Sequence, residues 1–213
     1  TSDFKRQKDL TCSSFCQIKA NILVCESTFA LPIFKWEETN LIANDIYNWV
    51  KESPEKTSIL YCYSLGKAQR LLNVLKDKKI KRIFTHKSIS RINNCYKKLG
   101  KDLIDTISFD KNNIPKNTLG SLVLIPPGLK NKNFINSMKS PQTGFASGWM
   151  IIRALKKRSG YDKGFVISDH ADWQGLITTI QESQADKIYL NHGNGENLAR
   201  YLRNKNNLNI SSQ

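Results

Sequence analysis

The sequence predicts an α/β protein in which buried strands alternate with amphipathic helices. Short runs rich in apolar and β-branched residues, such as 57–63 (TSILYCY) and 164–168 (GFVIS), are typical of buried strands. Residues 40–51 repeat apolar side chains at helical spacing, with Leu41, Ile42 and Ile46 on one face. These two patterns alternate from about residue 40 to residue 127, which is typical of a parallel sheet covered by helices.

The expected elements can be placed in chain order. Strands are expected within 21–25, 57–63, 78–84, 103–109, 122–125 and 187–193, and helices at 40–51, 68–76, 89–99, 174–185 and 195–203. Residues 149–155 and 164–168 are expected to pair as a hairpin, and the basic segment 130–139 is expected to be a loop or a short helix. The polar tail, 204–213, is expected to be frayed.

The charge of the chain indicates a polyanionic partner. Its 213 residues, enough to bury a sizeable core, include 33 Lys and Arg against 18 Asp and Glu, giving a formal net charge of +15. The basic residues are spread along the chain, and nucleic acid is the first candidate partner. The alternative is a lysine- and asparagine-rich proteome whose proteins are all basic, because net charge alone does not identify a ligand.

The five cysteines are odd in number and irregular in spacing. Cys25 and Cys62 fall within strand-like runs, where thiols usually pack as small hydrophobic groups. Cys12 and Cys16 have no second pair that would complete a zinc site. This usage fits a reducing compartment, and we expect a cytoplasmic protein without a signal peptide or a membrane-spanning run. Because the chain begins at Thr1 without methionine, we interpret it as a fragment or a processed piece.

Two of the three histidines end strand-like runs that flank one helix. This strand, helix, strand order predicts that His170 and His192 lie side by side at a sheet edge. A histidine at a strand end is often only a capped, solvated residue. Two together, near Asp169 and Asp172, favour a metal site or an acid–base site, because imidazole and carboxylate are common zinc ligands.

Two turns are candidates for anion binding. The turn after 57–63 contains Ser64 and Lys67 and leads into a helix with Arg70, an order that offers backbone N–H groups to a phosphate. The alternative is a plain helix start with Ser64 as its N-cap. The second turn, around Ser147 and Gly148, either approaches an anion or simply serves the expected hairpin.

Several motifs together resemble a known family. Asp3 in TSDF, Glu26 in CESTF, His170 in SDHADW and His192 in LNHG occur in the order found in metallo-β-lactamase-fold nucleases with an inserted β-CASP domain. The connecting phrases YSLGKAQRLL, GFASGWM and ENLARYL agree as well. Essentially the whole chain resembles the bacterial ligase-associated DNA exonucleases, which are also described as mRNA 3′-end processing factor-like exonucleases.

The resemblance implies the fold and the domains. The chain looks like the C-terminal part of a metallo-β-lactamase αββα sandwich with an inserted β-CASP α/β domain. Residues 1–36 and 149–213 would belong to the sandwich and 37–148 to the insert. The HxHxDH segment of the family is missing, and with it the N-terminal half of the sandwich. We therefore expect an exposed apolar face on the remaining half, whereas the insert could fold alone.

The resemblance also implies roles for individual residues. Asp3 looks like the aspartate that bridges two metal ions, and His192 like the last metal-ligand histidine. Glu26 looks like the acid that supports His170, and His170 like the histidine near the scissile phosphate. The metals would be two zinc ions, with manganese possible. The residues expected to hold flanking phosphates are Ser64, Lys67, Arg70, Ser147 and Gly148.

The implied function is that of a metal-dependent phosphodiesterase, an exonuclease acting on DNA ends in ligation or repair. A functional link to an ATP-dependent DNA ligase and a helicase goes with it. An RNA 3′-end processing exonuclease and a catalytically inert, basic nucleic-acid-binding fragment are the alternatives. Because Asp3 and His192 alone are too few ligands for a stable catalytic zinc site, we expect this chain by itself to be inactive.

Overall fold

The computed structural model describes residues 2–130, 132–206 and 209–212, which form two compact units. The first unit comprises the described residues of Thr1–Lys8, Ser13–Trp36 and Ser168–Gln213. The second comprises Asp9–Cys12 and Glu37–Ile167. The predicted domains were divided after residue 36 and after residue 148. In the structure, residues 149–167 belong to the same unit as residues 37–148.

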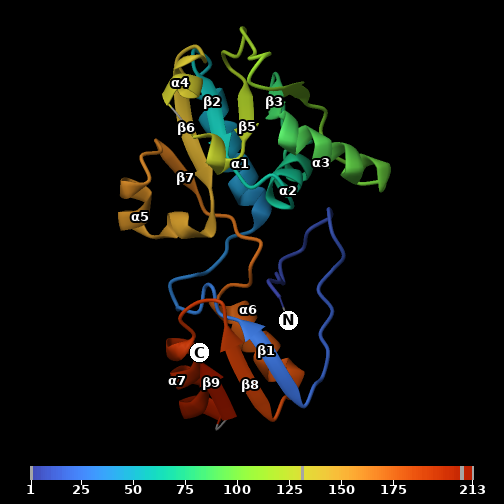
Figure 1. The fold of residues 1–213 in the computed structure, drawn as a ribbon, viewed down its shortest axis with the longest axis vertical. Helices are drawn as coiled ribbons and strands as arrows, with labels where there is room; N and C mark the ends of the chain where they lie inside the picture. The colour runs from blue at the N-terminus through green and yellow to red at the C-terminus, as the bar shows by residue number, and fades with distance from the viewer. Residues whose placement is uncertain (1, 131, 207–208, 213) are drawn as a thin grey trace. The chain divides into compact units, whose positions relative to one another are not determined.

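The second unit is built on a six-stranded sheet in which every pairing is parallel (Figure 1). The spatial order is β4-β3-β5-β2-β6-β7. The strands are β2 (Thr57–Tyr61), β3 (Ile83–His86), β4 (Ile107–Phe109), β5 (Leu122–Ile125), β6 (Pro141–Ala146) and β7 (Lys163–Phe165). The predicted α/β fold class is therefore confirmed, and β5 has the bounds that its apolar run predicts.

Helices and short turns connect these strands and cover the sheet. They are α1 (Thr39–Lys51), α2 (Lys67–Val74), α3 (Lys87–Lys98), α4 (Lys132–Asn136), α5 (Arg153–Arg158) and the 3₁₀ turns η1 (Pro127–Leu129) and η2 (Gly148–Ile151). In β2, Leu60 packs in the cluster that contains α1 and α2, whereas Ile59 and Tyr61 pack in a second cluster. Burial on both faces explains why this strand is a continuous apolar run and not an alternating one.

The predicted hairpin of 149–155 with 164–168 is wrong. Residues 148–151 form η2, residues 153–158 form α5, and β7 pairs parallel to β6. The Ser147 hydroxyl accepts a hydrogen bond from the Trp149 N–H and so caps η2. Parallel neighbours require a crossover connection, which the turn and helix supply. At Gly164 a Cβ atom would lie 2.9 Å from Met150 Cβ, so the glycine allows η2 to pack closely on β7.

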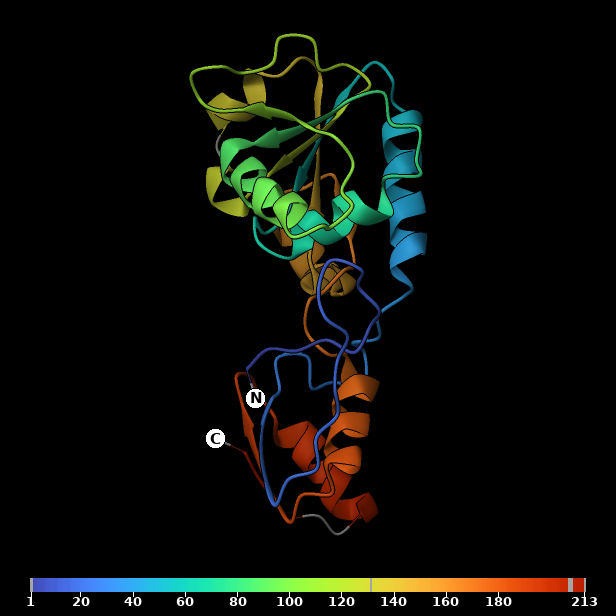
Figure 2. The ribbon, with the colours of Figure 1, turned by 90° about the vertical axis from the view of Figure 1, so that its right-hand side faces the viewer.

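The first unit contains a three-stranded parallel sheet with helices on one face (Figure 2). Its strands are β1 (Ile22–Glu26), β8 (Lys187–Asn191) and β9 (Asn209–Ser212), in the order β1-β8-β9, and its helices are α6 (Trp173–Ser183) and α7 (Glu196–Asn206). The prediction of a frayed tail is wrong for 209–212, since these residues pair with β8. Residues 207, 208 and 213 of that tail lie outside the described residues.

One face of the three-stranded sheet is exposed. Leu23 and Cys25 of β1 are buried, but Ile22 and Val24, which alternate with them, are 56% and 43% exposed. Tyr189 of β8, the partner of Val24 in register, is 40% exposed. The expectation of an apolar face left open to solvent agrees with this pattern.

The strand, helix, strand unit predicted around His170 and His192 is also wrong. The strand before α6 is β7, which belongs to the six-stranded sheet, whereas β8 belongs to the three-stranded sheet. His170 lies in the irregular segment that leads from one sheet to the other. None of the helices that the structure describes is long and apolar enough to cross a membrane.

Candidate functional site

Glu26, the last residue of β1, is a fully buried carboxylate. Its Oε1 atom accepts a hydrogen bond of 3.1 Å from the Phe4 N–H, and its Oε2 atom lies 2.8 Å from Nδ1 of His170. Burial alone would raise the pKa of the Glu26 carboxyl. The hydrogen bonds from His170 and from the Phe4 N–H, the charge of His170 and a hydrogen bond from Thr28 together lower that pKa below its usual range. Glu26 therefore stays ionised and binds His170 through Nδ1.

The loop around His170 is fixed by its own hydrogen bonds. The backbone N–H of His170 donates to the Ser168 hydroxyl over 3.1 Å, and the backbone C=O accepts from Trp36 Nε1 over 2.9 Å. The imidazole also packs edge-on against Phe29, with ring centroids 5.6 Å apart. With Nδ1 bound to Glu26, the ring has a single orientation in which Nε2 points away from the carboxylate.

Asp172 ties the same loop to the next helix. Its Oδ1 atom accepts from the Gly175 N–H over 2.8 Å and so caps α6. Its Oδ2 atom accepts from the Trp36 N–H over 3.1 Å. The acid that the sequence placed near a metal site is therefore a helix cap in the structure, and such a cap typically contributes about 1 kcal/mol.

Asp3 completes a cluster of three groups. Its Oδ2 atom lies 3.7 Å from Nε2 of His170, and the carboxyl group is 59% exposed. One ligand atom from each of Asp3, Glu26 and His170 lies within 4.8 Å of the others. Glu26 is fully buried and its two oxygens are directed at the Phe4 N–H and at His170 Nδ1, so the more accessible metal ligands of the cluster are the Asp3 carboxylate and His170 Nε2. Two ligands are fewer than the three protein ligands of catalytic zinc sites, so these residues alone do not fit such a site.

His192 lies in the loop after β8, at a left-handed φ of 55°. Its N–H donates to Asn191 Oδ1 over 2.8 Å, and its C=O accepts from Thr28 Oγ1 over 3.2 Å. At the next residue, Gly193, φ is +128° and a Cβ atom would lie 2.5 Å from the Ser27 carbonyl oxygen. Within the part of the chain that the structure describes, the cluster of closely spaced ligand groups includes Asp3 but not His192.

The residues expected to hold phosphates lie in the second unit. Ser64 follows β2 and Ser147 follows β6, and these two strands are direct neighbours. Carboxyl ends of adjacent parallel strands are the usual place for ligands in open α/β sheets. Ser64 and Ser147 therefore both follow the carboxyl ends of neighbouring parallel strands, and the Ser64 hydroxyl lies 3.3 Å from that of Ser88.

The start of α2 differs from a plain serine cap. The N-cap is Gly66, at φ 76°, and no side chain caps the helix. Lys67 is buried, with Nζ 5.2 Å from the centre of the Tyr63 ring. Arg70 is 1% exposed, and its Nη2 donates to Thr39 Oγ1, which ties α2 to α1. A phosphate contact by Arg70 would require its guanidinium to leave this interior position.

His86 has a structural role that was not predicted from the sequence. This residue ends β3 and caps α3, with Nδ1 accepting from the Ser88 N–H over 3.3 Å. The Ser88 hydroxyl lies 2.9 Å from the same Nδ1 and 3.3 Å from the Ser64 hydroxyl. Burial and the charge of Lys87 lower the pKa of His86, with a smaller opposing effect of Asp110. The pattern of a strand-ending histidine with serine two residues later was a signal that could have found this network.

Comparisons with known proteins relate the chain to longer proteins. No family model matches it. A probable DNA ligase from Opitutus terrae is 25% identical over 207 residues, which is 96% of this chain and 20% of that protein. A crystal structure of a protein of unknown function from Enterococcus faecalis is similar in fold, with a TM-score of 0.56 and 10% identity. That match covers 92% of this chain and 50% of the other. The chain thus spans about a fifth of the first protein and half of the second.

Proposed function

We propose that this chain contributes an acid–base histidine to the hydrolysis of phosphodiester bonds at DNA ends. The observation that carries the proposal is the hydrogen bond between buried Glu26 and His170 Nδ1. A carboxylate at Nδ1 fixes the orientation of the ring and raises the basicity of Nε2. In this role Nε2 would hold a proton beside the leaving oxygen and donate it as the bond breaks.

The substrate class is supported by charge and by similarity. A formal net charge of +15 favours a polyanion. The match of almost the whole chain to part of a probable DNA ligase favours DNA over RNA. We also propose on this basis that the chain works with DNA ligation, as an end-trimming exonuclease in a longer protein.

The metal requirement concerns that longer protein. Two zinc ions, or manganese, are what the family resemblance implies, but the Asp3 carboxylate and His170 Nε2 are too few ligands to hold them. We therefore propose that further ligands come from residues outside this chain. The role of Glu26 and His170 described above does not depend on that part of the proposal.

A second candidate function follows from the shortage of ligands. A basic chain that offers two metal ligands could bind nucleic acid without cutting it. Binding of this kind weakens steeply with salt, because each phosphate contact releases counterions. DNA binding without cleavage under any metal would favour this candidate.

The test is a nuclease assay of the chain and of the chain extended upstream. End-labelled single- and double-stranded DNA and RNA are incubated with Zn²⁺ or Mn²⁺. We expect trimming of DNA by the extended chain, and we expect His170→Ala to slow it by about 10²–10⁴-fold. Asp186→Asn, which removes an exposed carboxylate of the same unit, is the matched control and should cut normally. Undiminished cleavage by His170→Ala would overturn the proposal.

A further inference from the structure

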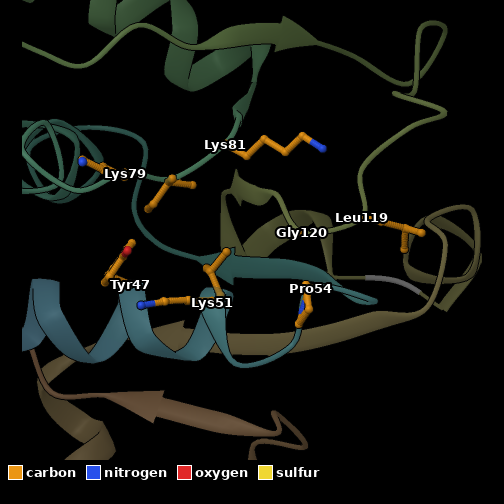
Figure 3. Close-up of a pocket in the computed structure, with 9 residues that line it drawn as sticks. Tyr47, Lys51, Pro54, Lys79, Lys81, Leu119 and Gly120 are labelled. Atoms are coloured by element: carbon orange, nitrogen blue, oxygen red, sulfur yellow. The ribbon is translucent and has the colours of Figure 1, made fainter.

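A cavity of about 240 Å³ lies in the second unit, away from the carboxyl ends of its strands (Figure 3). We refer to it as the lysine pocket. The residues that line it are Tyr47, Val50, Lys51, Pro54, Lys79, Ile80, Lys81, Leu119 and Gly120. None of them belongs to the candidate residues described above, so the pocket is a separate feature of the molecule.

The lysine pocket is formed where four segments meet at the amino edge of the six-stranded sheet. Tyr47 and Lys51 come from the last turns of α1, and Lys79 and Lys81 come from the segment before β3 (Figure 3). The remaining segments precede β2 and β5. Ligand sites of parallel sheets are usually at the carboxyl edge, so a site here would be additional to them.

One of the residues that line the pocket is a glycine in a turn. Gly120 has a φ of +66°, and a Cβ atom there would lie 3.2 Å from the Pro54 carbonyl oxygen. Its N–H donates to the Lys56 carbonyl oxygen over 2.8 Å. The turns before β2 and β5 are thereby fixed against each other, and the pocket does not depend on side-chain positions alone.

The lining has one sign of charge. Lys51, Lys79 and Lys81 are exposed, and none of the described lining residues is acidic. The nearby acids Glu52 and Glu55 do not line the pocket. Lysine ammonium groups bind phosphate oxygens as point charges, and their combined field attracts an anion.

The same lining has an apolar part. Val50 is buried, and Tyr47 and Ile80 are half-buried. The Lys51 ammonium lies 5.7 Å from the centre of the Tyr47 ring. Cations that follow a backbone, interleaved with aromatic and apolar surface for sugars and bases, are typical of single-strand binding.

We propose that the lysine pocket binds the phosphate backbone of single-stranded DNA. The inference rests on the nucleic-acid substrate class of the proposed function, and it adds an anchoring site in the second unit. A strand fits better than a free nucleotide, because enclosed small-ligand sites are usually about 300–1,000 Å³. This pocket is smaller, at about 240 Å³, and its three lysines reach into solvent.

The test measures binding, without metal, of a fluorescein-labelled single-stranded oligonucleotide by anisotropy. We compare Lys79→Gln/Lys81→Gln with Lys98→Gln/Lys111→Gln, which removes the same charge at exposed lysines outside the pocket. The pocket variant should bind on the order of tenfold more weakly at low salt. For the pocket variant, the negative slope of log K against log salt concentration should become shallower by about 1.4, which is about 0.7 for each of the two lost phosphate contacts. Circular dichroism confirms that both variants are folded.

Each outcome separates this inference from the proposed function. If the two double variants bound the oligonucleotide with equal affinity, the proposal that the lysine pocket binds DNA would be overturned. This conclusion would hold whatever the effect of His170→Ala on cleavage. A weaker pocket variant supports it, even if His170→Ala still cuts DNA and the acid–base proposal fails. If DNA affinity is unchanged while labelled poly-glutamate binds more weakly, the pocket serves an acidic protein and the inference is overturned.

Discussion

The Nδ1 atom of His170 lies 2.8 Å from Oε2 of Glu26, although 144 residues separate the two along the chain. The carboxylate is fully buried, and its other oxygen accepts a hydrogen bond from the Phe4 N–H. One acidic side chain therefore joins the start of the chain, the end of β1 and the loop before α6. The pair is a structural connection as well as a candidate acid–base device.

Removing the Glu26 carboxylate should destabilise the first unit. Glu26→Ala leaves the Phe4 N–H and His170 Nδ1 without this acceptor in the interior, and we expect a loss of about 1–3 kcal/mol. Glu26→Gln keeps the size of the side chain and an acceptor oxygen, so its loss should be smaller. Urea unfolding measures both, with Asp186→Asn as an exposed acidic control of the same unit. Equal stability of Glu26→Ala and the control would contradict the expectation.

Acid should weaken the same unit through Glu26. Although burial alone would raise it, the pKa of this carboxyl is lowered in the folded protein from its usual value of 4.5 by the hydrogen bonds and charge around it. A group of this kind contributes stability that is fully present above its unfolded pKa and is lost as the pH falls through its folded pKa. We therefore expect the urea concentration at the unfolding midpoint to decrease as the pH is lowered below about 4.5. The decrease should be less steep in Glu26→Gln, which lacks this carboxyl group. If the urea midpoint of the unmodified protein and that of Glu26→Gln depended on pH in the same way, this expectation would be refuted.

The five thiols should fall into two classes. Cys12, Cys16 and Cys95 are exposed, and Cys25 and Cys62 are buried. Burial, together with the charge of Glu26, raises the pKa of Cys25 to about 12, so it carries almost no thiolate near neutral pH. Ellman's reagent should titrate three thiols quickly in the native protein and all five after denaturation. Rapid reaction of Cys25 or Cys62, located by mass spectrometry of the labelled peptides, would show that the cores open easily.

Gly193 should not tolerate a side chain. Gly193→Ala would place a Cβ atom 2.5 Å from the Ser27 carbonyl oxygen at a φ of +128°. We expect a cost of about 1–3 kcal/mol from the strained backbone, with the steric clash in addition. Gly128→Ala is the control, because a Cβ atom there meets nothing within 4 Å. Thermal melts of the two variants should differ by several degrees, and equal melting temperatures would contradict the geometry.

Most of the second unit could be predicted because its elements are local patterns. The apolar stripe of α1 and the four buried residues of β5 each carry their own signal. The prediction of a strand at 149–155 was wrong, because a short apolar run does not show whether it is a strand or part of a helical connection. The same run does not show whether the next strand is antiparallel, as in a hairpin, or parallel and reached by a crossover. That choice is made by the Ser147 cap and by the packing of Met150 against Gly164.

The site was harder to predict because its parts are far apart in sequence. Proximity of Glu26 and His170 was expected from family resemblance and not from spacing. The reasoning that joined His170 to His192 failed because the strand before α6 belongs to another sheet. Arg70 was expected to contact a phosphate, but its side chain is buried and donates to Thr39 Oγ1, and no local sequence pattern distinguishes these two roles. Long-range burial is what a single sequence does not reveal.

The order of segments in the two units has a consequence for how the protein forms during synthesis. Residues 37–167, almost all of the second unit, leave the ribosome before His170 does, so that unit can fold while the first is incomplete. After Glu26 has been synthesised, more than a hundred further residues are added before His170, with which it forms its hydrogen bond. During that time its carboxylate has no His170 to bind and β1 has no β8 to pair with. We therefore expect chaperones to bind the chain, or aggregation to begin, while the first unit is still incomplete.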